Sequence, residues 1–148
     1  MLPVREVMTR QVISVAPDAT VDQVIELLLR HQVSGLPVVD DEQRLLGVVT
    51  EFDLLEALYD HEIGDQPVSA HMTRDPLCVE DDTPLVTVAD VMLTSRVRRL
   101  PVVRDGRLAG LVSRHDLIRV IQELRRRVTA GRVAGVERSE PPANHVAS

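Results

Sequence analysis

Two short segments of the 148-residue sequence carry polar side chains at a spacing that suits ligand binding. Thr50 stands three residues before Asp53, and Ser113 stands three residues before Asp116. Each hydroxyl lies where a strand-like run gives way to a helical pattern, so it can contact a phosphate together with helix N-terminal N–H groups. Each carboxylate can accept hydrogen bonds from a ribose diol. The same spacing is also a helix-capping pattern worth roughly 1 kcal/mol without a ligand, and the two roles can coexist.

Other constellations typical of catalysis or metal binding are missing from the sequence. The five His residues lack metal-ligand spacing. The acidic runs at residues 40–42 and 80–82 are short turn segments, which favours solvated loops, and Mg²⁺ is expected only beside a bound triphosphate. Cys78 is the single cysteine, and no Gly-x-Ser-x-Gly, Walker or Cys-x-x-Cys motif is present. We therefore expect a protein that is not an enzyme and holds no cofactor.

The composition excludes further classes of protein. The net charge is −6, and Phe52 and Tyr59 are the only aromatic residues, which disfavours proteins that stack bases in a basic groove. No apolar run approaches the roughly 18 residues of a membrane span, and no signal segment opens the chain, so we expect a cytoplasmic protein. The three arginines at residues 125–127 suit a helix C-terminus, with a partner or nucleic-acid contact as the alternative.

The elements that must position the polar side chains occur twice. Val7-Met8-Thr9-Arg10 aligns with His71-Met72-Thr73-Arg74 at an offset of 64 residues, as Leu36-Pro37-Val38-Val39 does with Leu100-Pro101-Val102-Val103. One residue then drops out, and Gly47-Val48-Val49-Thr50 aligns with Gly110-Leu111-Val112-Ser113 at an offset of 63. The alignment indicates two tandem copies of about 60 residues each.

Each copy predicts the order strand, helix, strand, strand, helix, and therefore an α/β (α+β) fold. Thr20 stands three residues before Gln23 in a capping-box pattern, and Pro84 takes the first helical position of the second copy. Gly47 and Gly110 lack a Cβ, so a ligand or a neighbouring backbone can approach closely. The copies span 1–62 and 66–126, with a linker near 60–67 and a tail at 129–148 that we expect to be disordered. The predicted strands are 12–15, 36–39, 45–49, 77–79, 100–103 and 108–112, and the predicted closing helices are 51–59 and 114–127.

These motifs, in this order and duplicated, resemble a tandem pair of cystathionine-β-synthase (CBS) domains over residues 3–125. The resemblance implies a stand-alone pair of repeats in one pseudo-twofold disc with two clefts. It implies ligands that bear adenosine, such as AMP, ADP, ATP or S-adenosylmethionine, whose binding regulates a partner protein. It also implies a homodimer formed through the exposed helices near residues 54–59 and 117–124.

The resemblance further implies that aliphatic side chains and backbone groups hold the adenine. In the alternative interpretation these residues belong only to the core and the turns, and Cys78 in particular is a small buried filler rather than a nucleophile. The expected residues are Ile13 and Ser14 with Gly35, Leu36 and Pro37, and Leu77 and Cys78 with Arg99, Leu100 and Pro101.

The charge is unevenly distributed along the chain. Residues 1–65 hold 4 Arg and 13 acidic residues, whereas residues 66–124 hold 8 of each. Because Arg98, Arg99 and Arg114 lie near the second motif, we expect the cleft with Ser113 and Asp116 to bind the phosphate-bearing nucleotide better. The alternative is that these arginines form surface ion pairs. Two other functions remain open: a ligand-free structural or dimerisation module, and a nucleic-acid-associated regulator acting through residues 125–127.

Overall fold

The first half of the chain forms an antiparallel hairpin with helices beside it. The structure, a computed structural model, describes residues 2–131. Helix α1 (Val21–His31) precedes β1 (Gly35–Val39), β2 (Leu45–Thr50) and the one-turn helix α2 (Glu51–Leu54). The predicted capping box at the start of α1 is confirmed, because the Thr20 hydroxyl accepts the N–H of Gln23 and the Gln23 side chain accepts the N–H of Thr20.

The second half repeats this arrangement with longer elements. The strand β3 (Thr73–Arg74) comes first, followed by β4 (Val79–Glu80), α3 (Leu85–Ser95), β5 (Arg99–Arg104), β6 (Arg107–Ser113) and α4 (Arg114–Gly131). The strands form two three-stranded sheets, in the orders β1-β2-β3 and β4-β5-β6. Within the second sheet β4 runs parallel to β5, whereas β5 and β6 are antiparallel. The predicted mixed α+β fold of two similar units is confirmed.

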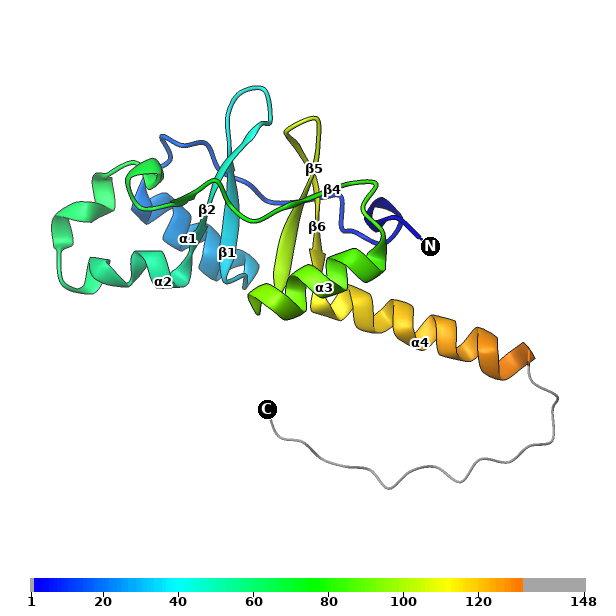
Figure 1. The fold of residues 1–148 in the computed structure, drawn as a ribbon. Coiled ribbons are helices and arrows are strands. Elements are labelled where there is room, and N and C mark those ends of the chain that lie inside the picture. Colours follow the sequence, from blue (N-terminus) through cyan, green and yellow to red (C-terminus); the bar gives the residue numbers. More distant parts are fainter. Residues whose placement is uncertain (1, 132–148) are drawn as a thin grey trace, which may run out of the picture.

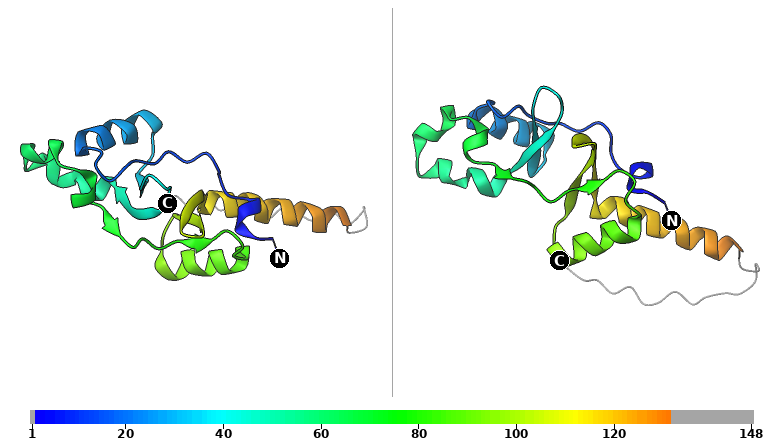
Figure 2. Two further views of the ribbon diagram at one scale, coloured as in Figure 1. Left: turned by 90° about the horizontal axis from the view of Figure 1, so that it is seen from above. Right: turned by 45° about the horizontal axis from the view of Figure 1, so that its top comes forward.

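The two hairpins lie side by side, and their tips are joined (Figures 1 and 2). Arg44 and Arg107 form an antiparallel bridge, and the backbone N–H of Leu108 donates to the carbonyl of Gln43 at 2.8 Å. Helices α2, α3 and α4 lie at the opposite end of the molecule from these tips in Figure 1. The hairpins therefore bring equivalent strands of the two copies together around one pseudo-twofold axis.

The segment that begins each copy packs on the other copy. The backbone N–H of Thr9 donates to the carbonyl of Leu111 at 2.8 Å, and the N–H of Val4 donates to the carbonyl of Thr83 at 2.8 Å. In the same way β3, which begins the second copy, pairs with β2 of the first. Each sheet or core is thus completed by chain from both copies, which explains why neither copy needs a large core of its own.

The glycine of each repeated motif makes room for this exchanged segment. A Cβ built on Gly47 would lie 2.6 Å from the carbonyl oxygen of Thr73, and one on Gly110 would lie 2.6 Å from the carbonyl oxygen of Thr9. Real Cβ atoms do not approach so closely, so only glycine fits. Of the two alternatives for these glycines, it is a neighbouring backbone that approaches them.

The two cores are built from aliphatic side chains, as the composition predicts. One core surrounds α1 and the first hairpin, with Val24, Val38 and Val49 fully buried. The other surrounds α3 and the second hairpin and includes Val4 from the exchanged N-terminal segment. Both aromatic residues lie at the surface, where Phe52 is 82% exposed and Tyr59 is 89% exposed.

The predicted linker at 60–67 is wrong as a description of loose chain. Residues His61–Asp65 form a 3-10 turn, and the side chain of Ile63 is buried in the first core. This segment packs against α1 so closely that a Cβ on Gly64 would meet the carboxylate of Asp22 at 2.5 Å. The preceding predicted helix, 51–59, is also shorter than expected, since α2 ends at Leu54 and a 3-10 turn, Leu55–Leu58, follows.

Other predicted boundaries shift for simple reasons. The predicted strands 12–15 and 77–79 contribute little pairing: only Val15 forms a bridge, to Val38, and β4 begins at Val79. Pro84 precedes α3 as its N-cap rather than opening it. The expected disorder of the tail is wrong for residues 129–131, which complete α4. The rest of that prediction, residues 132–148, lies outside the described residues.

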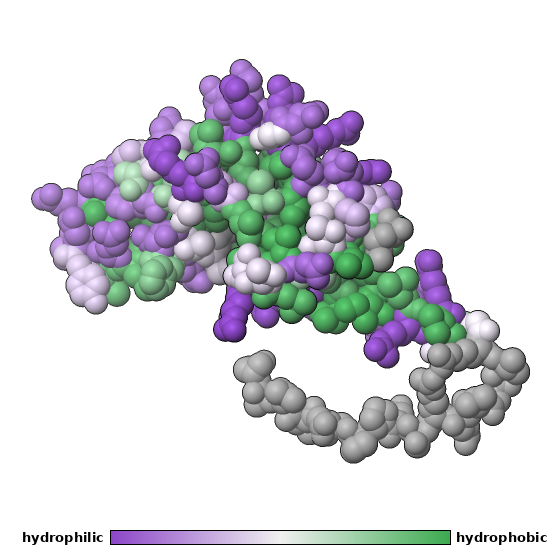
Figure 3. All heavy atoms as spheres, in the orientation of Figure 1, coloured by the Kyte–Doolittle hydropathy of each residue, from purple (hydrophilic) through white to green (hydrophobic). Residues whose placement is uncertain are grey.

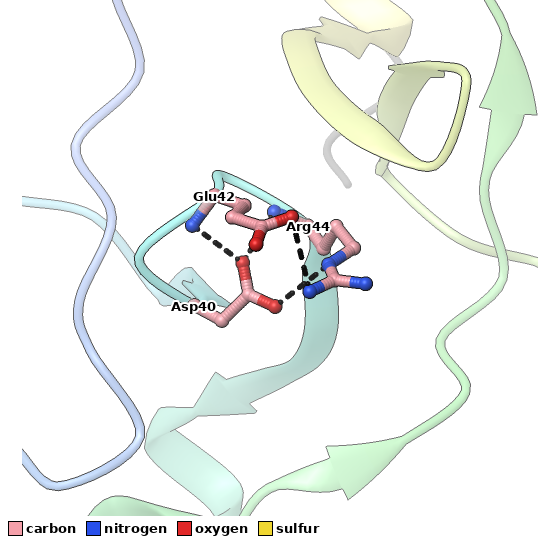
Figure 4. A network of polar contacts seen from close by, with 3 residues as sticks. All are labelled: Asp40, Glu42 and Arg44. Carbon is pink, nitrogen blue, oxygen red and sulfur yellow. Dashed lines mark hydrogen bonds and ion pairs between the residues drawn. The ribbon is translucent and has the colours of Figure 1, made fainter.

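The acidic run at 40–42 forms a tight turn held by its own side chains (Figure 4). The Asp40 carboxylate accepts the backbone N–H groups of Glu42 and Arg44, each at 2.9 Å, and the Nε of Arg44 at 3.0 Å. The hydrogen bond from the Arg44 backbone is the main cause that lowers the pKa of Asp40. The carboxylate of this turn is therefore engaged in folding the hairpin. Within residues 2–131, no cluster of three or more His, Cys, Asp or Glu side chains could hold a metal ion.

Candidate functional site

Two cavities of similar size lie where the two halves of the molecule meet. The first, called here the Thr50 cleft, has a volume of about 370 Å³ and reaches Thr50, Leu77 and Leu100. The second, called here the Ser113 cleft, has a volume of about 350 Å³ and reaches Ser113 and Ile13. Each volume is within the range of small-molecule sites.

Each cleft combines the motif of one copy with the apolar strands of the other. Ser113 belongs to the second copy, whereas Ile13 and Leu36 on the opposite wall of the Ser113 cleft belong to the first. The Thr50 cleft is the reverse, because Thr50 of the first copy faces Leu77 and Leu100 of the second. The cause is the exchange of leading segments, which carries residues 9–13 beside β6 and residues 73–77 beside β2. A ligand in either cleft therefore contacts both copies.

Both motifs form complete helix caps. The backbone N–H of Thr50 donates to Oδ2 of Asp53 at 2.9 Å, and the N–H of Asp53 donates to the Thr50 hydroxyl at 3.4 Å. The corresponding distances for Ser113 and Asp116 are 2.8 Å and 3.1 Å. The capping interpretation is thus confirmed. The ligand-contact interpretation remains compatible with it, since an ionised carboxylate can accept more than one hydrogen bond.

The four motif residues differ in their access to the clefts. Ser113 and Asp116 both line the Ser113 cleft, whereas only Thr50 of the first pair lines its own cleft. The carboxylate of Asp53 is turned to Thr50, accepting from both its N–H and its hydroxyl. The Ser113 cleft is consequently the one in which a carboxylate is available at the wall.

Most of the residues expected to hold a base do line a cleft. Gly35, Leu36 and Arg99 line both. Ser14 and Cys78 line neither, because successive strand residues point to opposite sides and their neighbours Ile13 and Leu77 take the cleft side. The others that line a cleft are Ile13 in the Ser113 cleft and Pro37, Leu77, Leu100 and Pro101 in the Thr50 cleft.

Burial, together with the nearby charge of Glu80, raises the pKa of the Cys78 thiol. The side chain is half-buried beside β4 rather than exposed in a cleft. A thiol with a raised pKa is a poor nucleophile near neutral pH. The geometry agrees with a small filler.

Several wall residues were not expected from the sequence. Thr9 and Gln11 line the Ser113 cleft, and Thr73 and Pro76 line the Thr50 cleft. Thr9 and Thr73 belong to the repeated Met-Thr motif, which was the available signal that these segments meet something specific. The sequence alone did not indicate that each would lie across the molecule from its own copy.

The cations gather around the Ser113 cleft. His115 and Arg119 line it, and a further hollow of about 410 Å³ adjoins it, bounded by Arg98, Arg99 and Arg114 among others. Within residues 2–131, none of these last three arginines forms an ion pair within 4.0 Å. Their guanidinium groups are therefore available to an anion from solution, contrary to the alternative of surface ion pairs.

The Thr50 cleft has a different charge pattern. Arg98 and Arg99 reach its wall from the second copy, but the helical positions equivalent to Arg114, His115 and Arg119 are occupied by other residue types. At the offset of 63 residues these equivalents are Glu51, Phe52 and Glu56. The end of this cleft near α2 is therefore acidic, where the end of the Ser113 cleft near α4 is basic.

The family model for the CBS domain matches the chain twice, over residues 4–60 and 68–123. The chain belongs to the CBS domain family. The two matches confirm the tandem pair inferred from the internal repeat, and the crossed clefts above lie between the members of this CBS pair.

Solved structures and curated proteins agree with this assignment. CBSX2 of Arabidopsis thaliana, solved in complex with AMP, is 35% identical with a TM-score of 0.76, covering 84% of this chain and 99% of that chain. The CBS domain pair of MJ0100, in complex with 5-methylthioadenosine and S-adenosyl-L-methionine, is 25% identical with a TM-score of 0.70 over 83% and 98%.

An uncharacterised protein of Methanocaldococcus jannaschii, MJ1225, is 37% identical over 119 residues, which is 80% of this chain. The chain spans only 42% of the length of that relative. Within residues 2–131 of this CBS pair, the helices are too short or too polar to cross a membrane.

Proposed function

We propose that this CBS pair is a regulatory module that binds an adenine nucleotide in the Ser113 cleft. The observation that carries the proposal is the joining of three features at one wall: the Ser113 hydroxyl at the start of α4, the Asp116 carboxylate, and the cations His115 and Arg119. A phosphate suits the hydroxyl and the cations, and a ribose diol suits the carboxylate. The complexes of CBSX2 with AMP and of MJ0100 with S-adenosyl-L-methionine support a ligand of this class.

The base would lie between aliphatic walls. The Ser113 cleft offers Ile13, Val33 and Leu36, and no aromatic residue lines it. Backbone groups of the strand edge at Gly35 would supply the hydrogen bonds that distinguish one base from another. Selectivity for adenine would therefore depend on the backbone, and conservative changes of the aliphatic residues should alter affinity more than selectivity.

The Thr50 cleft is proposed to take a ligand with less negative charge. Its walls are apolar at Leu77 and Leu100, and the adjoining helix begins with Glu51. An adenosyl compound without a phosphate, such as S-adenosylmethionine, fits this environment better than AMP does, because a phosphate near acidic side chains is repelled.

Binding would be transmitted to a partner protein through the packing of the two copies. A ligand in a crossed cleft contacts both copies, so its binding energy can favour one relative arrangement of them over another. No catalytic step is proposed, and the regulated partner is a protein not identified by these residues.

A thermal-shift panel with AMP, ADP, ATP and S-adenosylmethionine tests the proposal, with the triphosphate measured with and without Mg²⁺. Saturation at about 100 times Kd should stabilise the fold by about 2.7 kcal/mol. Mass spectrometry of the compounds that co-purify gives an independent identification. If none of the four ligands raises Tm, the second candidate is favoured: a ligand-free structural module, for which the complete caps at Thr50 and Ser113 already account.

A further inference from the structure

The helical surfaces that follow the two motifs are equivalent in position but opposite in charge. We define the acidic face as Glu51, Leu55, Glu56, Leu58 and Glu62. The basic face is the set of residues 63 positions later, Arg114, Ile118, Arg119, Ile121 and Arg125. Both faces therefore carry an apolar pair flanked by three charges of one sign.

The apolar residues of both faces are unpartnered within the described chain. Leu58 is 77% exposed and Ile118 is 60% exposed, and Leu55 and Ile121 are also exposed. Helix α4 has no buried residue along its whole length and extends away from the rest of the molecule (Figures 1 and 2). Figure 3 shows apolar surface over α3 and α4, in contrast to the hydrophilic hairpin tips. Exposed apolar surface of this extent is typical of a protein interface.

The charges of the two faces are reversed at every matched position. Glu51 corresponds to Arg114, Glu56 to Arg119, and Glu62 to Arg125. At the same time each apolar position keeps a similar side chain, since Leu55 and Leu58 correspond to isoleucines. One face is therefore complementary to the other in charge while matching it in apolar character.

We infer that a second copy of this chain covers these faces in a head-to-tail orientation, with the acidic face of each protomer against the basic face of the other. In this arrangement both contacts of the twofold dimer join glutamates to arginines around an apolar centre. In the head-to-head alternative, glutamates would meet glutamates and arginines would meet arginines. Like charges across an interface oppose association, so charge selects the orientation. The inference is independent of any ligand.

Cysteine cross-linking between protomers tests the orientation directly. In a Cys78→Ser background, Leu58→Cys protein is mixed with Ile121→Cys protein, and Leu55→Cys protein is mixed with Ile118→Cys protein. We expect disulfide-linked dimers from at least one mixture under oxidising conditions, and little cross-linking when each variant is oxidised alone. Self-linking of the single variants, without cross-linking in the mixtures, overturns the head-to-tail orientation. A monomer at micromolar concentration in light scattering overturns the interface altogether.

Charge reversal gives a second measurement that does not depend on disulfide geometry. Glu56→Arg together with Glu62→Arg should weaken dimerisation roughly tenfold at low salt and less at high salt. Adding Arg119→Glu and Arg125→Glu should restore it. Asp41→Arg, an equal change of charge at the hairpin tip, is the matched control and should have no effect. A head-to-head dimer would be unaffected by reversing one face, because like charges would still oppose like charges.

Discussion

Replacing Asp116 by Ala separates the two roles of the Ser113 motif, and Asp53→Ala is its internal control. Each carboxylate caps its helix through the same contact, at 2.8 Å from the N–H of Ser113 and 2.9 Å from the N–H of Thr50. Only Asp116 also lines a cleft. The two variants therefore remove the same structural interaction but differ in what they remove from a ligand site.

The magnitudes follow from these contacts. Loss of a cap costs about 1 kcal/mol, and loss of a negative charge at a helix N-terminus adds about 0.3–1 kcal/mol. For a domain of this size both variants should lower Tm by about 3–8 °C. A hydrogen bond from ribose to a charged carboxylate is worth about 1.5–3 kcal/mol, so Asp116→Ala should weaken AMP binding about 10- to 100-fold. Asp53→Ala should weaken it by no more than about threefold.

Isothermal titration with AMP, at a temperature well below both melting transitions, measures the affinities, and calorimetric or fluorescence melting measures Tm. Equal losses of AMP affinity in the two variants would refute the asymmetry between the clefts. Unchanged affinity in Asp116→Ala, combined with the expected fall in Tm, would show that Asp116 acts only as a helix cap. The ligand and capping interpretations thus predict different pairs of numbers.

Three further predictions concern local packing and titration. Gly110→Ala should lower Tm, at a cost of about 1–3 kcal/mol, because its Cβ would lie 2.6 Å from the carbonyl oxygen of Thr9, whereas Gly131→Ala, which meets nothing within 4 Å, should not. Because the pKa of Asp40 is lower when folded, its carboxylate stabilises the fold fully above its usual value of 3.8 and loses this effect as the pH falls through the lowered pKa. In melting curves at several pH values, Asp40→Asn should therefore show a smaller loss of Tm in acid than the parent protein. Alkylation of the Cys78 thiol should reach half its maximal rate above pH 9.0, because burial raises its pKa, and a half-maximum at lower pH would contradict this.

The internal repeat predicted the fold well because it is written in residue types. The strand pairs, the capping box at Thr20 and the position of Ser113 at a strand-to-helix junction all follow from periodicity and capping chemistry. The expected linker failed for a physical reason: Ile63 sits in a segment with polar and glycine neighbours, and a single apolar residue there gives no periodic signal although it is buried.

The composition of the clefts was beyond the reach of the repeat. An alignment of two copies states which residues are equivalent, but it does not state which copy a segment packs against. Only the close approach of Thr9 to Gly110, and of Thr73 to Gly47, reveals that each copy gives its leading segment to the other. As a result Ile13 and Ser113, which are 100 positions apart in the sequence, line one cavity.

Duplication also explains how one design supports both an asymmetric pair of clefts and an oriented interface. Positions such as Glu56 and Arg119 lie outside both cores, so their charges can diverge without affecting the fold. Arg119 lines the Ser113 cleft and also belongs to the basic face. A phosphate bound beside it would reduce the positive charge that the acidic face of a second protomer meets. By linkage, phosphate binding and head-to-tail dimerisation would then oppose each other to the same extent, which gives the module a direct way to convert nucleotide binding into a change of assembly.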